Sequence, residues 1–213
     1  EPDSVRALVA RAEGGGYVLT SLMAKLRCES LPERSHVPAF VYFFDMLFPF
    51  AWVNDPRRAM AAAAGGCMLV RTDALRQVGG VASIRGALID DCSLGQKLKQ
   101  AGPIWLGLTD RVRSIRRYEG WDDVRAMVSR SAYAQLNYSP LLLAGTILGL
   151  ALTFLAAPYL ALFGDGLARL AGVLTWGLMA VSFQPMLRFY RLSPWWGLAL
   201  PAVAFAYMLY TLD

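Results

Sequence analysis

Two adjacent carboxylates, Asp90 and Asp91, are the residues of this sequence best suited to acid or base chemistry. They stand just before Leu94 and Leu98, a spacing that predicts the start of a short helix. A carboxylate held rigidly at a helix start can act as a general base when it faces a cleft. The alternative is structural, because Asp before a helix commonly caps it by accepting the first free backbone N–H groups. The residues alone leave both interpretations open.

A glycine pair, Gly65 and Gly66, precedes these carboxylates in the chain and is followed by Cys67. Glycine permits a close approach to the backbone, which a bulky acceptor or a diphosphate would need. A tight turn needs the same freedom, so the pair fits either a binding pocket or a turn.

Cysteine and histidine content disfavours several other kinds of site. The three cysteines, Cys28, Cys67 and Cys92, are far apart and include no C-x-x-C, so no disulfide framework is predicted. His36 is the single histidine, and it gives no support for a His-based zinc site or a Ser-His-Asp triad. No metal site is predicted within this chain.

The composition divides the chain near Pro140. Hydrophobic residues make up 56% of the sequence and charged residues 17%, against roughly 45 to 50% and about 25% in an ordinary soluble domain. The net charge of +5 comes almost entirely from arginine. This charge fits a basic face near anionic lipid headgroups or, alternatively, phosphate recognition by arginine. No interleaved basic and aromatic run indicates nucleic-acid binding.

Three apolar segments after Pro140 predict membrane spans over about 141–163, 170–187 and 195–212. The turn after the second segment carries Arg188 and Arg191, so we expect it on the cytosolic side. The turn around Gly164–Gly166 is then expected on the outside. The polar part would face the cytosol.

Short helices and strands alternate before Pro140, which indicates an α/β fold. The hydrophobic spacing and turn residues predict helices from Ser4, Thr72, Asp90 and Trp121, and strands over 17–28, 65–71, 104–108 and 112–115. The aromatic segment Pro38–Trp52 is too short to cross a bilayer. It is predicted to lie as a helix along the membrane surface, with a buried core helix as the alternative.

Four runs in one order carry a resemblance to family 2 glycosyltransferases, and more narrowly to the members associated with hopanoid biosynthesis, relatives of ceramide glucosyltransferases. The runs are VNDPRR at Val53–Arg58, AAAAGGCMLVR at Ala61–Arg71, GALIDDC at Gly86–Cys92, and AYAQLNYSPLLL at Ala132–Leu143. The resemblance covers essentially the whole chain. It implies the C-terminal half of a nucleotide-diphospho-sugar transferase domain of the GT-A type, over residues 1–138, followed by about three transmembrane helices over 139–213.

The resemblance also implies roles for the residues singled out above. Asp91 matches the second acid of the family's acidic pair, which supplies the catalytic base, and Asp90 matches the first. Gly65, Gly66 and Cys67 match the small-residue turn at the acceptor pocket. The implied reaction is inverting transfer of a sugar from a nucleotide-sugar donor to a lipid hydroxyl, with a hopanoid acceptor suggested by association. The implied location is the cytosolic face of a bacterial inner membrane.

Two departures from the family pattern bear on these expectations. The wider family holds a divalent metal, Mg²⁺ or Mn²⁺, through a D-x-D motif, and no D-x-D occurs here. Because Glu1–Val5 resembles the sequence just downstream of that motif, the metal and donor site is expected in a preceding half, and the fragment alone is expected to be inactive. Of the family's Gln-x-x-Arg-Trp motif only Arg130 carries over. It could neutralise the leaving diphosphate or simply face lipid.

A non-catalytic function is the main alternative. A membrane scaffold or lipid-binding module derived from a transferase would share the same sequence pattern. A transporter fragment is disfavoured, because the apolar segments carry no interior charge of the kind that marks a transport site.

Overall fold

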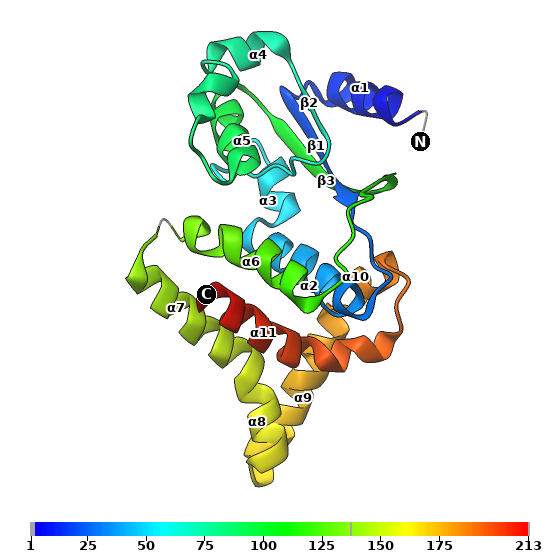
Figure 1. Ribbon diagram of the computed structural model, residues 1–213, viewed down its shortest axis with the longest axis vertical. Coiled ribbons are helices and arrows are strands. Elements are labelled where there is room, and N and C mark those ends of the chain that lie inside the picture. Colours follow the sequence, from blue (N-terminus) through cyan, green and yellow to red (C-terminus); the bar gives the residue numbers. More distant parts are fainter. Residues whose placement is uncertain (1–2, 137, 213) are drawn as a thin grey trace. The chain divides into compact units, whose positions relative to one another are not determined.

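The computed structural model describes residues 3–136 and 138–212 (Figure 1). Two expectations fall partly outside this range, namely the resemblances at Glu1–Val5 and at Ala132–Leu143, which include positions 1, 2 and 137. The described chain forms two compact units. The first comprises residues up to Arg27 together with Phe44–Arg116, and the second comprises Cys28–Phe43 together with residues from Arg117 onward.

A three-stranded sheet forms the centre of the first unit. Its strands are β1 (Leu19–Lys25), β2 (Met68–Val70) and β3 (Ile104–Arg113), in the order β2-β1-β3. Strand β1 pairs antiparallel with β2 and parallel with β3. Leu19 is opposite both Val70 and Ile104, and it is completely buried. The expected α/β fold is therefore confirmed.

Short helices surround this sheet. They are α1 (Ser4–Gly15), α3 (Phe50–Asn54), α4 (Thr72–Gln77), the 3₁₀ turn η1 (Val81–Ile84) and α5 (Asp90–Ala101). Figure 1 shows α1 on one side of the sheet and α5 on the other, and both helices contact β3. The sequence predicts α1, α4 and α5 correctly, because glycines at positions 16, 79 and 102 follow the ends of these three helices. It does not predict α3 as a separate helix or the turn η1.

The expectation of two strands over 104–108 and 112–115 is wrong. The structure has one strand, β3, which runs without a break from Ile104 to Arg113. The strand is buried at its beginning and becomes exposed from Asp110, so the loss of hydrophobic residues marks its exit from the core rather than its end. The pairing of β1 with β3 shifts in register between Met23 and Lys25 of β1.

The segment expected as one surface helix over 38–52 forms α2 (Leu31–Leu47) and the separate helix α3, divided at Pro49. Helix α2 begins earlier than expected because Ser30 and Glu33 form a capping box. The Ser30 Oγ accepts from the Glu33 N–H at 3.3 Å, and the Glu33 Oε2 accepts from the Ser30 N–H at 2.9 Å. Residues of α2 up to Val41 are mostly buried, in agreement with the core-helix alternative.

Three helices of the second unit are long and apolar enough to cross a membrane, as expected, within the part of the chain that the structure describes. The first, Pro140–Phe163, contains α7 (Pro140–Leu150), a π-helical turn (Ala151–Leu155) and α8 (Ala156–Phe163). The second, Gly166–Phe189, contains α9 (Gly166–Ser182) and α10 (Gln184–Phe189). The third, Pro194–Leu212, contains a 3₁₀ segment (Pro194–Ala199) and α11 (Leu200–Leu212).

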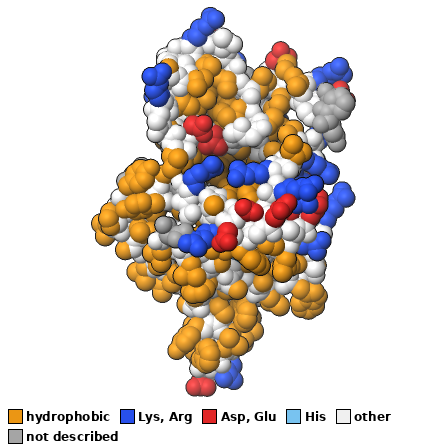
Figure 2. All heavy atoms as spheres, viewed as in Figure 1, with side chains coloured by type: hydrophobic (Ala, Val, Ile, Leu, Met, Phe, Trp, Pro, Cys, Tyr) orange, Lys and Arg blue, Asp and Glu red, His pale blue; other side chains and the backbone are white. Residues whose placement is uncertain are grey.

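Their surfaces are suited to lipid. The mean hydropathy of the three helices is 2.1, 1.4 and 1.3. Figure 2 shows hydrophobic side chains covering the hairpin of α8 and α9, with charged side chains at its end. Membrane association follows from this exposed apolar surface, because water would not solvate it favourably.

An amphipathic helix, α6 (Trp121–Gln135), packs against α11 in the second unit. Its buried face carries Val124, Met127 and Val128, and its charged residues lie on the opposite face. The helix expected from the sequence at this position is therefore confirmed.

Candidate active site

The alanine run Ala61–Ala64 is the buried segment that supports the candidate site. These residues are buried in the first unit outside any helix or strand, and they lead directly into the glycine pair. The buried Ser21 of β1 holds the end of the run. Its Oγ accepts from the Ala64 N–H at 2.8 Å and donates to the Ala64 carbonyl at 3.1 Å. Gly65 therefore leaves the core from a fixed point on the sheet.

Helix α5 packs closely against the alanine run Ala61–Ala64. A Cβ built on Gly95 would stand 3.1 Å from the backbone carbonyl carbon of Ala62, so only glycine allows this close packing without a shift of backbone. One turn earlier, the Cys92 thiol donates to the Ala63 carbonyl at 3.5 Å. Burial raises the pKa of Cys92 to about 12, so this thiol stays protonated and is not a nucleophile.

Asp91 lies at the point where α5 meets the glycine turn. Its Oδ2 accepts a hydrogen bond from the Gly65 N–H at 2.8 Å, and its Oδ1 accepts from the Cys92 N–H at 2.7 Å. The side chain is half-buried. A carboxylate oxygen has two lone pairs, so each oxygen keeps acceptor capacity after these bonds. Asp91 is therefore positioned by the backbone and can still accept a further hydrogen bond.

Asp90 occupies a different environment from Asp91. It is exposed, and its Oδ1 accepts from the Asp91 N–H at 2.9 Å. This contact is local to the first turn of α5, where negative charge is favoured by the helix dipole. The contact of Asp90 is therefore confined to the first turn of α5, whereas Asp91 also contacts another segment of the chain.

The other residues expected at the acceptor pocket surround this contact. Gly65 and Gly66 are exposed, and Cys67 is half-buried at the entry to β2. The Cys67 carbonyl accepts from the Leu22 N–H at 2.8 Å, which ties the turn to β1. Burial raises the pKa of the Cys67 thiol, so it contributes a small, uncharged wall.

Arg130 belongs to the second unit and lies on the exposed face of α6. Asp91 belongs to the first unit. The expected contact of Arg130 with a diphosphate therefore remains a prediction.

A divalent metal has no suitable set of ligands among the described residues. In that part of the chain, no three His, Cys, Asp or Glu side chains come close enough together to hold a metal ion. The acidic pair at the start of α5 is engaged by backbone N–H groups instead. The residues present here do not fit the metal that the family resemblance implies.

Sequence reasoning missed two residues that position Asp91. Ser21 fixes the alanine run through contacts across 43 positions of sequence, and no local pattern reveals such a pair. Gly95 did leave a signal, because glycine inside a helical pattern costs stability and commonly marks a close packing contact. Together these residues determine where the Asp91 carboxylate lies.

Comparison with known families gives one match, to the model described as glycosyl transferase family group 2, over residues 22–210. The match includes the Asp91 contact as well as the three apolar helices. Comparisons with curated proteins and with solved structures find no match. Because the family match spans most of the 213 residues, this chain belongs to glycosyl transferase family group 2.

Proposed function

We propose that this chain is the acceptor-side part of a membrane-bound glycosyltransferase that transfers a sugar, with inversion, from a nucleotide-sugar donor to a lipid hydroxyl. Family membership supports the donor class and the transfer reaction. The three apolar helices support an acceptor that is presented within or at a membrane. The resemblance to hopanoid-associated members favours a hopanoid acceptor and a bacterial inner membrane, with the reaction on the cytosolic side.

The observation that carries the proposal is the contact between Asp91 and Gly65. It holds a half-buried carboxylate beside an exposed turn of small residues, where an acceptor can approach. A hydroxyl is a poor nucleophile until a positioned base removes its proton. Asp91 provides that base, and the turn at Gly65–Cys67 provides space for the acceptor.

In the proposed transfer step, Asp91 accepts the proton of the acceptor hydroxyl. The acceptor oxygen forms a bond to the anomeric carbon of the sugar while its proton passes to Asp91. The bond from that carbon to the diphosphate breaks, and the diphosphate leaves with the electron pair. Attack opposite the leaving group inverts the anomeric centre.

The leaving diphosphate also needs countercharge. Arg130 is proposed for this role, since guanidinium groups suit phosphate oxygens. A divalent metal would supply further positive charge when bound, but this chain offers no ligand set for it among the described residues. No metal ligand is therefore assigned to the chain.

Transfer of radiolabelled sugar to a lipid acceptor by the complete membrane-embedded enzyme, in which this acceptor-side part is joined to a donor-binding part, tests the proposal, using Asp91→Asn and Asp90→Asn as a matched pair. General bases typically contribute about 10² to 10⁴-fold in rate. Asp91→Asn should lower turnover by roughly that factor and leave donor binding nearly intact. Asp90→Asn should keep most of the activity, because Asp90 is exposed and its bond from the Asp91 N–H can be accepted by an Asn side-chain oxygen as well.

The opposite pattern would assign the base differently. Near-normal turnover of Asp91→Asn removes Asp91 as the base and leaves it as a helix cap. A large loss confined to Asp90→Asn moves the role one residue back. Lack of transfer by the unmodified enzyme to every lipid acceptor tried would favour a scaffold derived from a transferase.

A further inference from the structure

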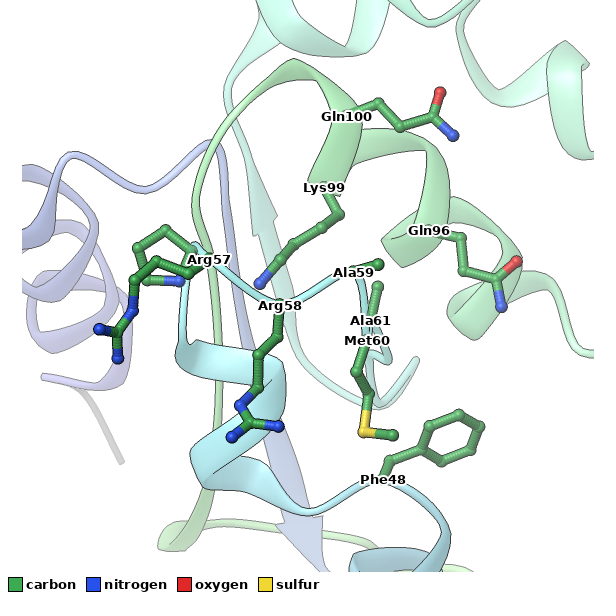
Figure 3. Close-up of a pocket in the computed structure, with 10 residues that line it drawn as sticks. Phe48, Arg57, Arg58, Ala59, Met60, Ala61, Gln96, Lys99 and Gln100 are labelled. Atoms are coloured by element: carbon green, nitrogen blue, oxygen red, sulfur yellow. The ribbon is translucent and has the colours of Figure 1, made fainter.

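The first unit contains a second feature suited to a ligand, an open cavity of about 700 Å³ between the loop after α3 and the face of α5. Its lining includes Phe48, Arg57, Arg58, Met60 and Lys99. Figure 3 shows Lys99 reaching from α5 toward the loop that carries the two arginines, with Met60 directed toward Phe48. The lining therefore combines cations with apolar side chains. Neither Asp91 nor the glycine turn belongs to it.

Lys99 is fixed in the wall of this cavity. Its Nζ donates to the Val53 carbonyl at 2.6 Å and to the Asp55 carbonyl at 2.9 Å. An ammonium group has three N–H donors, so one donor remains for a ligand. Both partners are uncharged carbonyls, which leave the positive charge of Lys99 uncompensated by these bonds.

The two arginines differ in how far their charge is neutralised. Arg57 forms two 3.0 Å hydrogen bonds with the carboxylate of Asp55, which hold the pKa of Asp55 at about 2. Arg58 is 3.7 Å from that carboxylate, and its guanidinium stacks 4.4 Å from the ring centre of Trp52. The three cations, with the one carboxylate of Asp55 that pairs with the two arginines, leave two positive charges in excess.

Exposed apolar residues of the same unit lie close in sequence to the cavity residue Phe48. Met46, Leu47 and Trp52 have 49%, 57% and 45% of their surface exposed, and they lie on either side of Phe48. Tryptophan beside arginine is typical of the membrane interface, where the ring enters the headgroup region and the cation meets phosphate. The exposed residues therefore favour a ligand that belongs to a lipid surface.

We propose that this cavity binds the phosphate group of an anionic phospholipid, with Arg58 and Lys99 contacting the phosphate and Met46, Leu47 and Trp52 entering the surrounding lipid. The site lies apart from Asp91 and serves to dock the first unit on the membrane. It goes beyond the transfer reaction proposed above and does not depend on it.

The charge and the apolar flank together select a phospholipid over a soluble phosphate. Two excess charges attract either ligand, but only a lipid also gains from burying exposed apolar side chains, at about 25 cal/mol for each Å² removed from water. The apolar helices of the same chain also keep lipid at high local concentration.

Native mass spectrometry of the purified full chain in neutral detergent tests the proposal by titration with phosphatidylglycerol or phosphatidylcholine. We expect retention of phosphatidylglycerol at lower concentration than phosphatidylcholine. Arg58→Gln should weaken retention of phosphatidylglycerol roughly tenfold, the effect of losing one charge-assisted hydrogen bond. Arg85→Gln is the matched control, because Arg85 is exposed in the same unit and does not line the cavity. This variant should retain phosphatidylglycerol as well as the unmodified protein does.

A variant that is expected to strengthen retention of the lipid distinguishes an effect on binding from an effect on folding. Asp55→Asn removes the carboxylate that neutralises Arg57 but keeps the carbonyl that accepts from Lys99, so it should tighten retention of phosphatidylglycerol. Equal retention by Arg58→Gln and the unmodified protein would overturn the proposal, as would a failure of Asp55→Asn to tighten it.

Competition with inorganic phosphate shows whether the site recognises a phospholipid or a soluble phosphate. We expect it to compete with phosphatidylglycerol only at concentrations far above those of the lipid. If inorganic phosphate displaces the lipid at equal concentration, the site recognises a soluble phosphate and the lipid assignment is wrong. Activity toward the transferase substrates does not enter these measurements, so failure here is distinct from failure of the Asp91 test.

Discussion

The Oδ2 of Asp91 accepts the N–H of Gly65 at 2.8 Å, across 26 positions of sequence. This contact joins the first turn of α5 to the end of the buried alanine run. A Cβ added at Gly65 would lie 3.3 Å from both the Cβ and the Oδ2 of Asp91. The position of the carboxylate therefore depends on the absence of a side chain at Gly65.

Gly65→Ala is accordingly expected to impair catalysis more than folding. The added methyl group presses on the Asp91 carboxylate, and a displacement of a fraction of an ångström moves the proposed base off its reacting geometry. The turnover number should fall by roughly tenfold or more, whereas the melting temperature changes little because Gly65 is exposed. Transfer assays and thermal unfolding of the same preparations measure the two effects.

Gly66→Ala serves as the control for this substitution. Its added Cβ would meet the Ala24 Cβ at 3.4 Å, an ordinary contact, and would not touch Asp91. Gly66→Ala should therefore leave the turnover number nearly unchanged, and because Gly66 belongs to the proposed acceptor turn, its effect is expected on the KM for the acceptor. Equal losses in Gly65→Ala and Gly66→Ala would mean that the turn itself, and not its contact with Asp91, limits the reaction.

Gly95→Ala tests the packing of α5 on the alanine run. The new Cβ would lie 3.1 Å from the carbonyl carbon of Ala62 and 3.3 Å from the N of Ala63, and backbone atoms yield little. Overpacking of this kind typically costs about 1 to 3 kcal/mol of the free energy of unfolding. Denaturant unfolding monitored by circular dichroism would measure the loss. Gly14→Ala in α1, where the added Cβ meets nothing within 4 Å, should instead be neutral or slightly stabilising.

Local patterns predicted much of this architecture. Glycines after α1 and α5, the acidic start of α5, and the apolar lengths of the three long helices are all signals that act within a few residues. The same local signals identified Asp91 and Gly65 separately. Nothing local indicated that these two residues touch.

The remainder could not be predicted because it rests on contacts between distant segments. The bonds of Ser21 with Ala64 and the parallel pairing of β1 with β3 join residues far apart in sequence. The early start of α2 is different, because it has a local cause. Ser30 and Glu33 form a capping box, and the expectation that the helix starts at Pro38 did not use this signal. The single strand β3 shows that hydrophobic alternation reports burial and not strand length.

His36 is expected to make the stability of the second unit depend on pH. Its side chain is 3% exposed among the rings of Trp121, Tyr207 and Tyr210, and its Nδ1 lies 2.8 Å from the Ser35 Oγ. Burial lowers the pKa of His36 below the usual 6.5. The unfolded chain therefore binds a proton more readily than the folded chain. Stability is fully present above about pH 6.5 and declines as the pH falls below it.

Thermal unfolding in detergent between about pH 8 and about pH 5.5 measures this dependence. The melting temperature of the unmodified protein should fall on acidification. His36→Phe keeps an aromatic ring at this position and removes the titrating group, so its melting temperature should fall less over the same range. Parallel curves for the two proteins would show that other groups cause the acid sensitivity.

The orientation of the apolar helices gives the last prediction. The turn between α8 and α9 holds Asp165, whose carboxylate lies 4.0 Å from the guanidinium of Arg169 at the start of α9, so the two charges largely cancel. Arg188, in the last turn of α10, and Arg191, in the turn that follows, have no acidic residue between them. Since basic loops stay in the cytosol, the α10 turn is expected inside and the α8–α9 turn outside.

Single cysteines at Gly166 and at Ser193, probed in intact cells with a membrane-impermeant thiol reagent, measure this orientation. Gly166→Cys should react from outside, because Gly166 is exposed at the first position of α9. Ser193→Cys should react only after the cells are permeabilised. The unmodified protein, with its three native cysteines, gives the background in both conditions. Reaction of Ser193→Cys alone from outside would reverse the orientation, and the proposed acceptor turn at Gly65–Cys67 could no longer be assigned to the cytosol from the distribution of arginine.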